Sequence, residues 1–219
     1  MRYSEWEPLY SGILEDMGYS REEDESSVRV LKAVTLNSDL VDPDDVRERF
    51  GPEATVFGDA DRLESDVSAH PPVGTLICSG SAVGRVMALG IMPDAVVTDL
   101  DGDIGPQLEA SARGAVTFVH AHGDNGDLVM SYAGLFRGPV VLTTQSRPEN
   151  TVFNFGGFTD GDRAVCIAQE MGCRRILLEG FDLDRPRAKE GSDPAVKARK
   201  LRWAGRVMDS LRDVEIVRL

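Results

Sequence analysis

The chain has 219 residues, of which 42% are hydrophobic and 28% are charged, and its formal net charge is -13. This composition is that of a globular protein with one sizeable core, and the acidic balance disfavours a protein that binds the backbone of nucleic acids. No apolar run approaches the length of a membrane span, no signal peptide is recognisable between Met1 and Asp16, and the three cysteines lack metal-finger spacing, so we expect reduced thiols and a cytoplasmic location.

The first 70 residues are predicted to form a small, mostly helical N-terminal lobe. Apolar residues recur at helical spacing between Trp6 and Met17. The charged stretch 21–26 is interpreted as a break, and residues 28–36 as a further helix or strand. The other elements expected in this lobe are a helix start at residues 42–45, a strand at residues 54–57 and a polar helix at residues 59–68.

From residue 71 to residue 219, short apolar segments alternate with helical segments. This alternation predicts an α/β catalytic domain, with a mostly parallel sheet flanked by helices on both faces. We expect strands at residues 75–78, 95–98, 115–119, 139–143, 175–178 and 214–217, and helices at residues 81–89, 106–113, 127–136, 160–171 and 194–211.

Polar or glycine clusters follow the predicted strands of this domain. In open parallel sheets, ligands bind at the carboxyl ends of the strands, so these clusters mark one edge of the sheet as the candidate site. The clusters are Ser79-Gly80-Ser81, residues 99–103, residues 120–125, Thr143-Thr144-Gln145 and residues 179–182.

The most informative cluster is Asp99-Leu100-Asp101-Gly102-Asp103. In an extended backbone, Asp99 and Asp101 would point to the same side. Two carboxylates about 4 Å apart repel by roughly 4 kcal/mol at an effective dielectric constant of about 20, and a cation between them would offset this. Oxygen ligands beside a phosphate favour Mg²⁺, so we predict Asp99, Asp101 and Asp103 as metal ligands. The alternative interpretation is a solvated acidic turn.

Two other functions are compatible with the same cluster. In a haloacid-dehalogenase-like phosphatase, Asp99 would be the nucleophile and Asp101 the acid. That family also needs a lysine, whereas this chain has none between Lys32 and Lys189. The second of these functions is that of a nucleotide-binding protein without catalytic activity.

Further candidates lie at the neighbouring strand ends. Asp124 and His122 follow one strand and are placed to orient an attacking hydroxyl. The free N–H groups of the helix that begins near Ser81 can bind an anion, although a plain helix cap is an equally simple interpretation. The residues predicted to bind the nucleotide are Ser79, Gly80, Ser81, Arg85, Thr143, Thr144 and Gln145.

Residues 154–163 join a glycine hinge to a predicted helix start. Their aromatic rings, amide and carboxylates suit a flat, nitrogen-rich ring. In the alternative interpretation, the phenylalanines belong to the core and Asp160 caps the helix. The residues predicted to bind this substrate are Asn154, Phe155, Asp160 and Arg163.

The order of these motifs resembles that of the archaeal 6-hydroxymethyl-7,8-dihydropterin pyrophosphokinases of the MptE type. The resemblance covers roughly residues 70–185 and extends more loosely to the N-terminal lobe. That family is similar in fold to the thiamine pyrophosphokinases, which also use aspartates at a sheet edge for Mg²⁺ and ATP.

The resemblance implies a Mg²⁺-dependent transfer of diphosphate from ATP to the hydroxymethyl group of a reduced pterin, with release of AMP. Such a reaction serves the synthesis of methanopterin or folate-type cofactors in archaea. Asp99, Asp101, Asp124 and His122 would then be the catalytic side chains. ATP and the reduced pterin are the expected partners; a nucleic acid or a membrane is not expected, and a homo-oligomer is left open.

Overall fold

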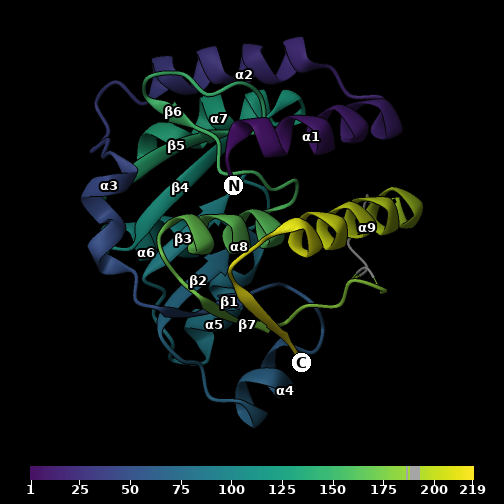
Figure 1. Cartoon of the computed structure of the whole chain (residues 1–219). Coiled ribbons are helices and arrows are strands. Elements are labelled where there is room, and N and C mark those ends of the chain that lie inside the picture. Colours follow the sequence, from purple (N-terminus) through teal and green to yellow (C-terminus); the bar gives the residue numbers. More distant parts are fainter. Residues whose placement is uncertain (186, 188–192) are drawn as a thin grey trace.

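The computed structural model describes residues 1–185, 187 and 193–219, and these form one sheet flanked by helices (Figure 1). The eight strands of the described residues are all parallel, in the order β6-β5-β4-β3-β2-β1-β7-β8. The predicted α/β architecture is therefore confirmed. The strands are β1 (Glu53–Phe57), β2 (Thr75–Ser79), β3 (Ala95–Thr98), β4 (Val116–Ala121), β5 (Val140–Thr144), β6 (Val152–Phe153), β7 (Arg175–Glu179) and β8 (Glu215–Arg218).

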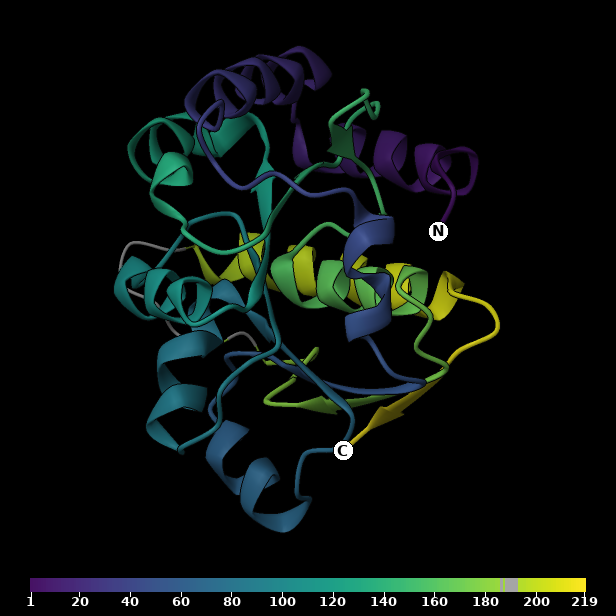
Figure 2. The same cartoon turned by 90° about the vertical axis from the view of Figure 1, so that its left-hand side faces the viewer.

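Helices cover both faces of this sheet, and Figure 2 shows α5 and α6 on the side opposite α8. Side chains alternate between the faces, so that Val56 and Ile77 pack with α8, whereas Phe57 and Cys78 pack with α5. No helix within the described ranges is long and apolar enough to cross a membrane. The helices are α1 (Tyr3–Met17), α2 (Arg21–Val34), α3 (Pro43–Val46), α4 (Leu63–Ala69), α5 (Val83–Ala88), α6 (Ile104–Ala112), α7 (Gly126–Tyr132), α8 (Asp160–Glu170) and α9 (Pro194–Ser210).

Helix α2 includes the charged stretch that was predicted to be a break, so that prediction is wrong. The hydroxyl of Ser20 caps the helix by accepting a hydrogen bond from the backbone N–H of Glu23, at 3.4 Å. Acidic residues in a first helical turn are favoured by the helix dipole. Further along α2, Val28 and Leu31 are buried against β4 and β5.

Strand β1 lies inside the sheet, where it pairs with both β2 and β7. The strands β2 to β6 follow on one side of β1, and β7 and β8 on the other, so the strand order reverses between β1 and β7. Reversals of this kind place a ligand crevice at the carboxyl ends of the strands. Because β1 belongs to the same sheet as the later strands, the division of the chain at residue 70 stays a prediction.

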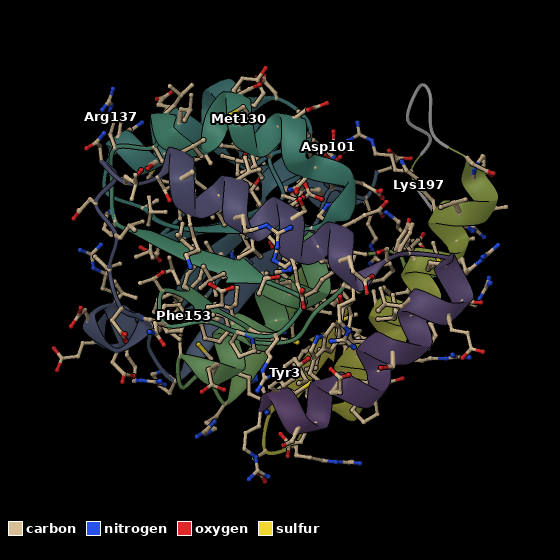
Figure 3. The ribbon with its side chains drawn as sticks, turned by 90° about the horizontal axis from the view of Figure 1, so that it is seen from above. Tyr3, Asp101, Met130, Arg137, Phe153 and Lys197 are labelled. Carbon is tan, nitrogen blue, oxygen red and sulfur yellow. The ribbon has the colours of Figure 1, made fainter. Side chains whose placement is uncertain are left out.

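Helices α1 and α9 lie side by side, although they are at opposite ends of the chain (Figures 1 and 3). A Cβ atom on Gly12 would lie 3.0 Å from the indole ring of Trp203, so the small residue allows the close approach. The indole N–H of Trp203 donates to the carboxylate of Asp16 at 2.8 Å. These contacts fix α9 relative to the N-terminal helices.

Candidate active site

A cavity of about 910 Å³ opens along the carboxyl ends of the strands. Asp101 and Lys197, both labelled in Figure 3, line it from the β3 loop and from α9. Six strands contribute to its wall through the residues at or just after their ends. These residues are Gly58 after β1, Ser79 at the end of β2, Asp99 after β3, His122 after β4, Gln145 after β5 and Gly180 after β7.

The aspartate loop has a conformation that the sequence pattern did not predict. Leu100 has a left-handed φ of 71°, and its side chain is buried in the core. The backbone between Asp99 and Asp101 is therefore not extended, and the N–H of Asp101 folds back onto Asp99 Oδ1 at 3.1 Å. Both aspartates nevertheless line the cavity, as does Asp103. Left-handed non-glycine residues are strained and cluster at functional sites.

Asp99 and His122 bring two strand ends together in the cavity, with His122 Nε2 at 3.5 Å from Asp99 Oδ2. The backbone N–H of Asp124 donates to His122 Nδ1 at 3.2 Å, so Nε2 is the ring nitrogen that faces Asp99. Burial alone would raise the pKa of Asp99, but the hydrogen bond to His122 and the charge of Arg163 hold that pKa well below its ordinary value. Asp99 is therefore ionised.

Asp160 and Arg163 form an ion pair that supports the aspartate loop from the start of α8. Arg163 Nη1 lies 2.7 Å from Asp160 Oδ1, and the side chain of Arg163 is only 2% exposed. The other oxygen of Asp160 accepts the backbone N–H of Asp99 at 3.3 Å. Asp160 thus lines the cavity and holds the loop, whereas Arg163 lies behind it.

Arg85 and Thr143, predicted to bind the nucleotide, have other partners and do not line the cavity. Arg85 forms ion pairs with Asp59 and Glu64. Thr143 is buried and its hydroxyl lies 3.0 Å from Nδ1 of His120. These positions do not support direct contact with a nucleotide.

Gly80 and Thr144 belong to the same predicted set and are also buried. A Cβ atom on Gly80 would lie 2.5 Å from Thr98 Oγ1, so this glycine permits the close packing of two strand ends. The hydroxyl of Thr144 accepts the backbone N–H of Ser146 at 3.1 Å. Both residues therefore support the strand ends without lining the cavity. The other members of the set, Ser79, Ser81 and Gln145, line the cavity.

Asn154 and Phe155, predicted to bind the substrate ring, serve the structure of the β5–α8 connection. The amide of Asn154 donates to the backbone carbonyl of Gln145 at 2.9 Å. The ring of Phe155 is 7% exposed and meets Phe118 edge-on, with ring centroids 6.1 Å apart. The side chain of Asp124, which was predicted to orient the hydroxyl, is exposed, and the backbone N–H of Asp124 donates to His122. None of these three residues lines the cavity in the described structure.

The sequence interpretation missed a buried carboxylate that connects the N-terminal helices to the site. Asp24 of α2 is 2% exposed and accepts three hydrogen bonds. The donors are the Tyr10 hydroxyl at 2.5 Å, the Gln145 amide at 2.9 Å and the Gly123 N–H at 2.7 Å. In the sequence, Asp24 is one of several acids at a helix start, so nothing in its local pattern marks it out.

A second group of missed residues forms an aromatic wall of the cavity. Tyr19, from the α1–α2 connection, and Phe158, from the loop before α8, both line the cavity, with ring centroids 6.3 Å apart. Phe158 lies within the segment that was expected to bind a ring, three residues after the phenylalanine that was chosen. The segment was therefore identified correctly, but the sequence did not show which of its rings lines the cavity.

The donors of the aspartate loop fit a hard cation in part. They are carboxylate oxygens at the wall of a cavity, which is the chemistry that Mg²⁺ prefers. Within the described part of the chain, no three His, Cys, Asp or Glu side chains are close enough to form a complete metal site. Phosphate oxygens and water would have to complete the coordination sphere, as is usual for Mg²⁺ bound with a nucleotide.

Comparisons with known proteins identify the family of this chain. The sequence model of the family described as "6-hydroxymethylpterin diphosphokinase MptE-like" matches residues 47–187. A 6-hydroxymethyl-7,8-dihydropterin pyrophosphokinase from Pyrococcus furiosus is 43% identical over 188 residues, covering 83% of this chain and 78% of the relative. Proteins of the same description from Methanothermobacter thermautotrophicus and Methanocaldococcus jannaschii are 36% and 28% identical, over 100% and 97% of both chains. The chain belongs to the MptE-like family of 6-hydroxymethylpterin diphosphokinases.

Proposed function

We propose that this protein transfers the β,γ-diphosphate of ATP to the hydroxymethyl group of 6-hydroxymethyl-7,8-dihydropterin, a step in the biosynthesis of a pterin cofactor. The observation that carries the proposal is the match to the family over residues 47–187, because this segment contains all six strand ends that line the cavity. In the reaction, the pterin hydroxyl oxygen forms a bond to the β-phosphorus, and the bond from that phosphorus to the α,β-bridging oxygen breaks. AMP leaves with the electron pair, and the hydroxyl loses its proton.

The residues of the cavity support this chemistry mainly by positioning the substrates and by balancing charge. His122 lines the cavity with its Nε2 facing Asp99, and it is the side chain best placed to orient the pterin hydroxyl. Asp99, Asp101 and Asp103 would hold Mg²⁺, which when bound neutralises charge on the phosphates. Tyr19 and Phe158 offer aromatic surface to a flat ring.

The test incubates the purified protein with ATP, Mg²⁺ and the reduced pterin, and identifies the nucleotide and pterin products by mass spectrometry. We expect AMP and the pterin diphosphate in equal amounts. ADP with a pterin monophosphate would instead indicate an ordinary kinase. Inorganic phosphate without a pterin product would favour the phosphatase hypothesis with Asp99 as nucleophile, and either result would overturn the proposal.

A further inference from the structure

The wall of the cavity carries more acidic than basic side chains, although a nucleotide polyphosphate would bring additional negative charge. If such a site binds a polyphosphate, a positively charged side chain is needed in addition to a metal ion to offset the repulsion. The acidic residues that line the cavity are Asp59, Asp99, Asp101, Asp103, Asp160, Asp182 and Asp193. The basic ones within the described residues are Arg185, Arg187, Lys197 and Lys200.

Three of these four cations are less suited to a bound phosphate than the fourth. Arg187 lies 2.6 Å from a carboxylate oxygen of Asp59 and 3.1 Å from one of Asp61, so its charge is already balanced. The ammonium of Lys197 donates to the backbone carbonyl of Arg187 at 3.0 Å. Arg185 is exposed to solvent, which screens its charge.

Lys200 is held in a different way. Its ammonium nitrogen lies 5.6 Å from the ring centroid of Tyr19 and 5.7 Å from that of Phe158. Aromatic faces attract a cation without neutralising it, whereas a carboxylate partner would do both. The acids of α9 and its N-cap, Asp193 and Asp209, are seven and nine residues from Lys200, and no carboxylate among the described residues forms an ion pair with it. Its charge is therefore available to a ligand.

The position of Lys200 is fixed by packing between the two ends of the chain. Gly18, with φ of 72°, ends α1 and turns the chain so that Tyr19 follows it towards the cavity. On the other side, the guanidinium of Arg199 donates to the backbone carbonyl of Asp16 at 2.8 Å. An ammonium held in place in this way loses little freedom when a phosphate binds.

We propose that Lys200 binds the phosphate chain of the nucleotide, with Tyr19 and Phe158 holding its ammonium towards the cavity. This inference rests on the proposed function only in taking ATP as a substrate. Arg85 was predicted from the sequence to bind the nucleotide and Arg163 to bind the substrate, but both side chains lie outside the cavity wall and are paired with carboxylates. The α9 helix therefore supplies the charge that the strand ends do not.

The test measures binding rather than turnover, so it needs no pterin. Native protein, Lys200→Met and Lys200→Arg are titrated by calorimetry with Mg²⁺ and α,β-methylene-ATP, whose α,β linkage cannot be cleaved. Adenosine, which lacks phosphates, is titrated by NMR. The matched control is Arg202→Met, which removes an exposed positive charge from the same helix.

Because a charge-assisted contact is lost, we expect Lys200→Met to bind the ATP analogue roughly 10-fold to 100-fold more weakly. Lys200→Arg keeps the positive charge and should lose less affinity than Lys200→Met. Arg202→Met should stay within about 3-fold of native, and the affinity for adenosine should not change. Native affinity should also fall more steeply with salt than that of Lys200→Met. Equal affinities of native protein and Lys200→Met for the analogue would overturn the proposal, and so would an equal loss for adenosine. If the pterin assay fails while these binding differences hold, only the proposed reaction is wrong.

Discussion

The buried carboxylate of Asp24 offers the sharpest test of how the N-terminal helices support the site. In Asp24→Ala, the hydroxyl of Tyr10 and the amide of Gln145, which are 0% and 3% exposed, both lose their acceptor. A buried donor left unsatisfied costs about 1–3 kcal/mol. Two such donors therefore predict a loss of about 2–5 kcal/mol in the free energy of unfolding, once the relief of removing a buried charge is included. This is a large part of a typical total of about 5–15 kcal/mol.

The assay is denaturation by urea, followed by circular dichroism, with Glu15→Ala as the matched control. Glu15 is an exposed carboxylate on α1, and its removal should change the free energy of unfolding by less than about 0.5 kcal/mol. Asp24→Asn keeps one acceptor oxygen and should lose less than Asp24→Ala. Because Gln145 lines the cavity, Asp24→Asn should also raise the KM of the reaction, whereas Glu15→Ala should not.

A double-mutant cycle with Tyr10→Phe separates the hydrogen bond from general effects of the substitutions. The hydroxyl of Tyr10 lies 2.5 Å from Asp24, so the two losses should not add, and the interaction energy should be about 1 kcal/mol or more. The reasoning is refuted if Asp24→Ala costs less than about 1 kcal/mol, or if the losses of the two single variants simply add.

Three further predictions concern the metal, a buried acid and a glycine. Asp101→Asn should abolish turnover while leaving the circular dichroism spectrum unchanged, and a chelator should silence the native enzyme; full activity in chelator would disprove the metal assignment. Burial, with the negative charge of Asp66, raises the pKa of Glu179 from 4.5 to about 7. The folded state therefore favours the protonated form of Glu179. The free energy of unfolding of native protein, relative to that of Glu179→Gln, should be highest below pH 4.5 and fall as the pH rises through about 7. Parallel pH profiles of unfolding for the two proteins would contradict this. Gly157→Ala should lower the free energy of unfolding by more than about 2 kcal/mol, because the φ of Gly157 is 95° and the new Cβ would lie 2.3 Å from Arg163 Cα. A Tm within about 2 °C of that of native protein would refute this prediction.

Most of the sheet could be predicted from the sequence because β2, β3, β4, β5 and β7 each carry a short apolar run that is followed by a polar or glycine cluster. The rule that ligands bind at the carboxyl ends of parallel strands then pointed to the edge of the sheet where the structure has its cavity. It also brought Ser79, Asp99 and His122 together, and all three line the same cavity. The resemblance to the pterin pyrophosphokinases was confirmed by the family match.

The remaining details depend on tertiary packing, which a local pattern does not record. Whether Phe155 or Phe158 faces the cavity is decided by the turn at Gly156 and Gly157, whose φ angles are 80° and 95°. The left-handed conformation of Leu100 depends on a core that its side chain can enter. Strand β6 has only two residues, too few for a period to be read.

The cavity is built and supported by residues beyond the segment that the family model matches. That segment, residues 47–187, provides the strand ends, but Gln145 at the edge of the site is held by residues outside it. Trp6 donates its indole N–H to the backbone carbonyl of Gln145 at 2.7 Å, and Asp24 accepts from the side-chain amide of Gln145 at 2.9 Å. Lys200 reaches the cavity from the other end of the chain. Since α1 contacts α9 through Asp16, the two flanking regions support each other, and the full-length match of the Methanothermobacter relative is what a site built from both ends requires.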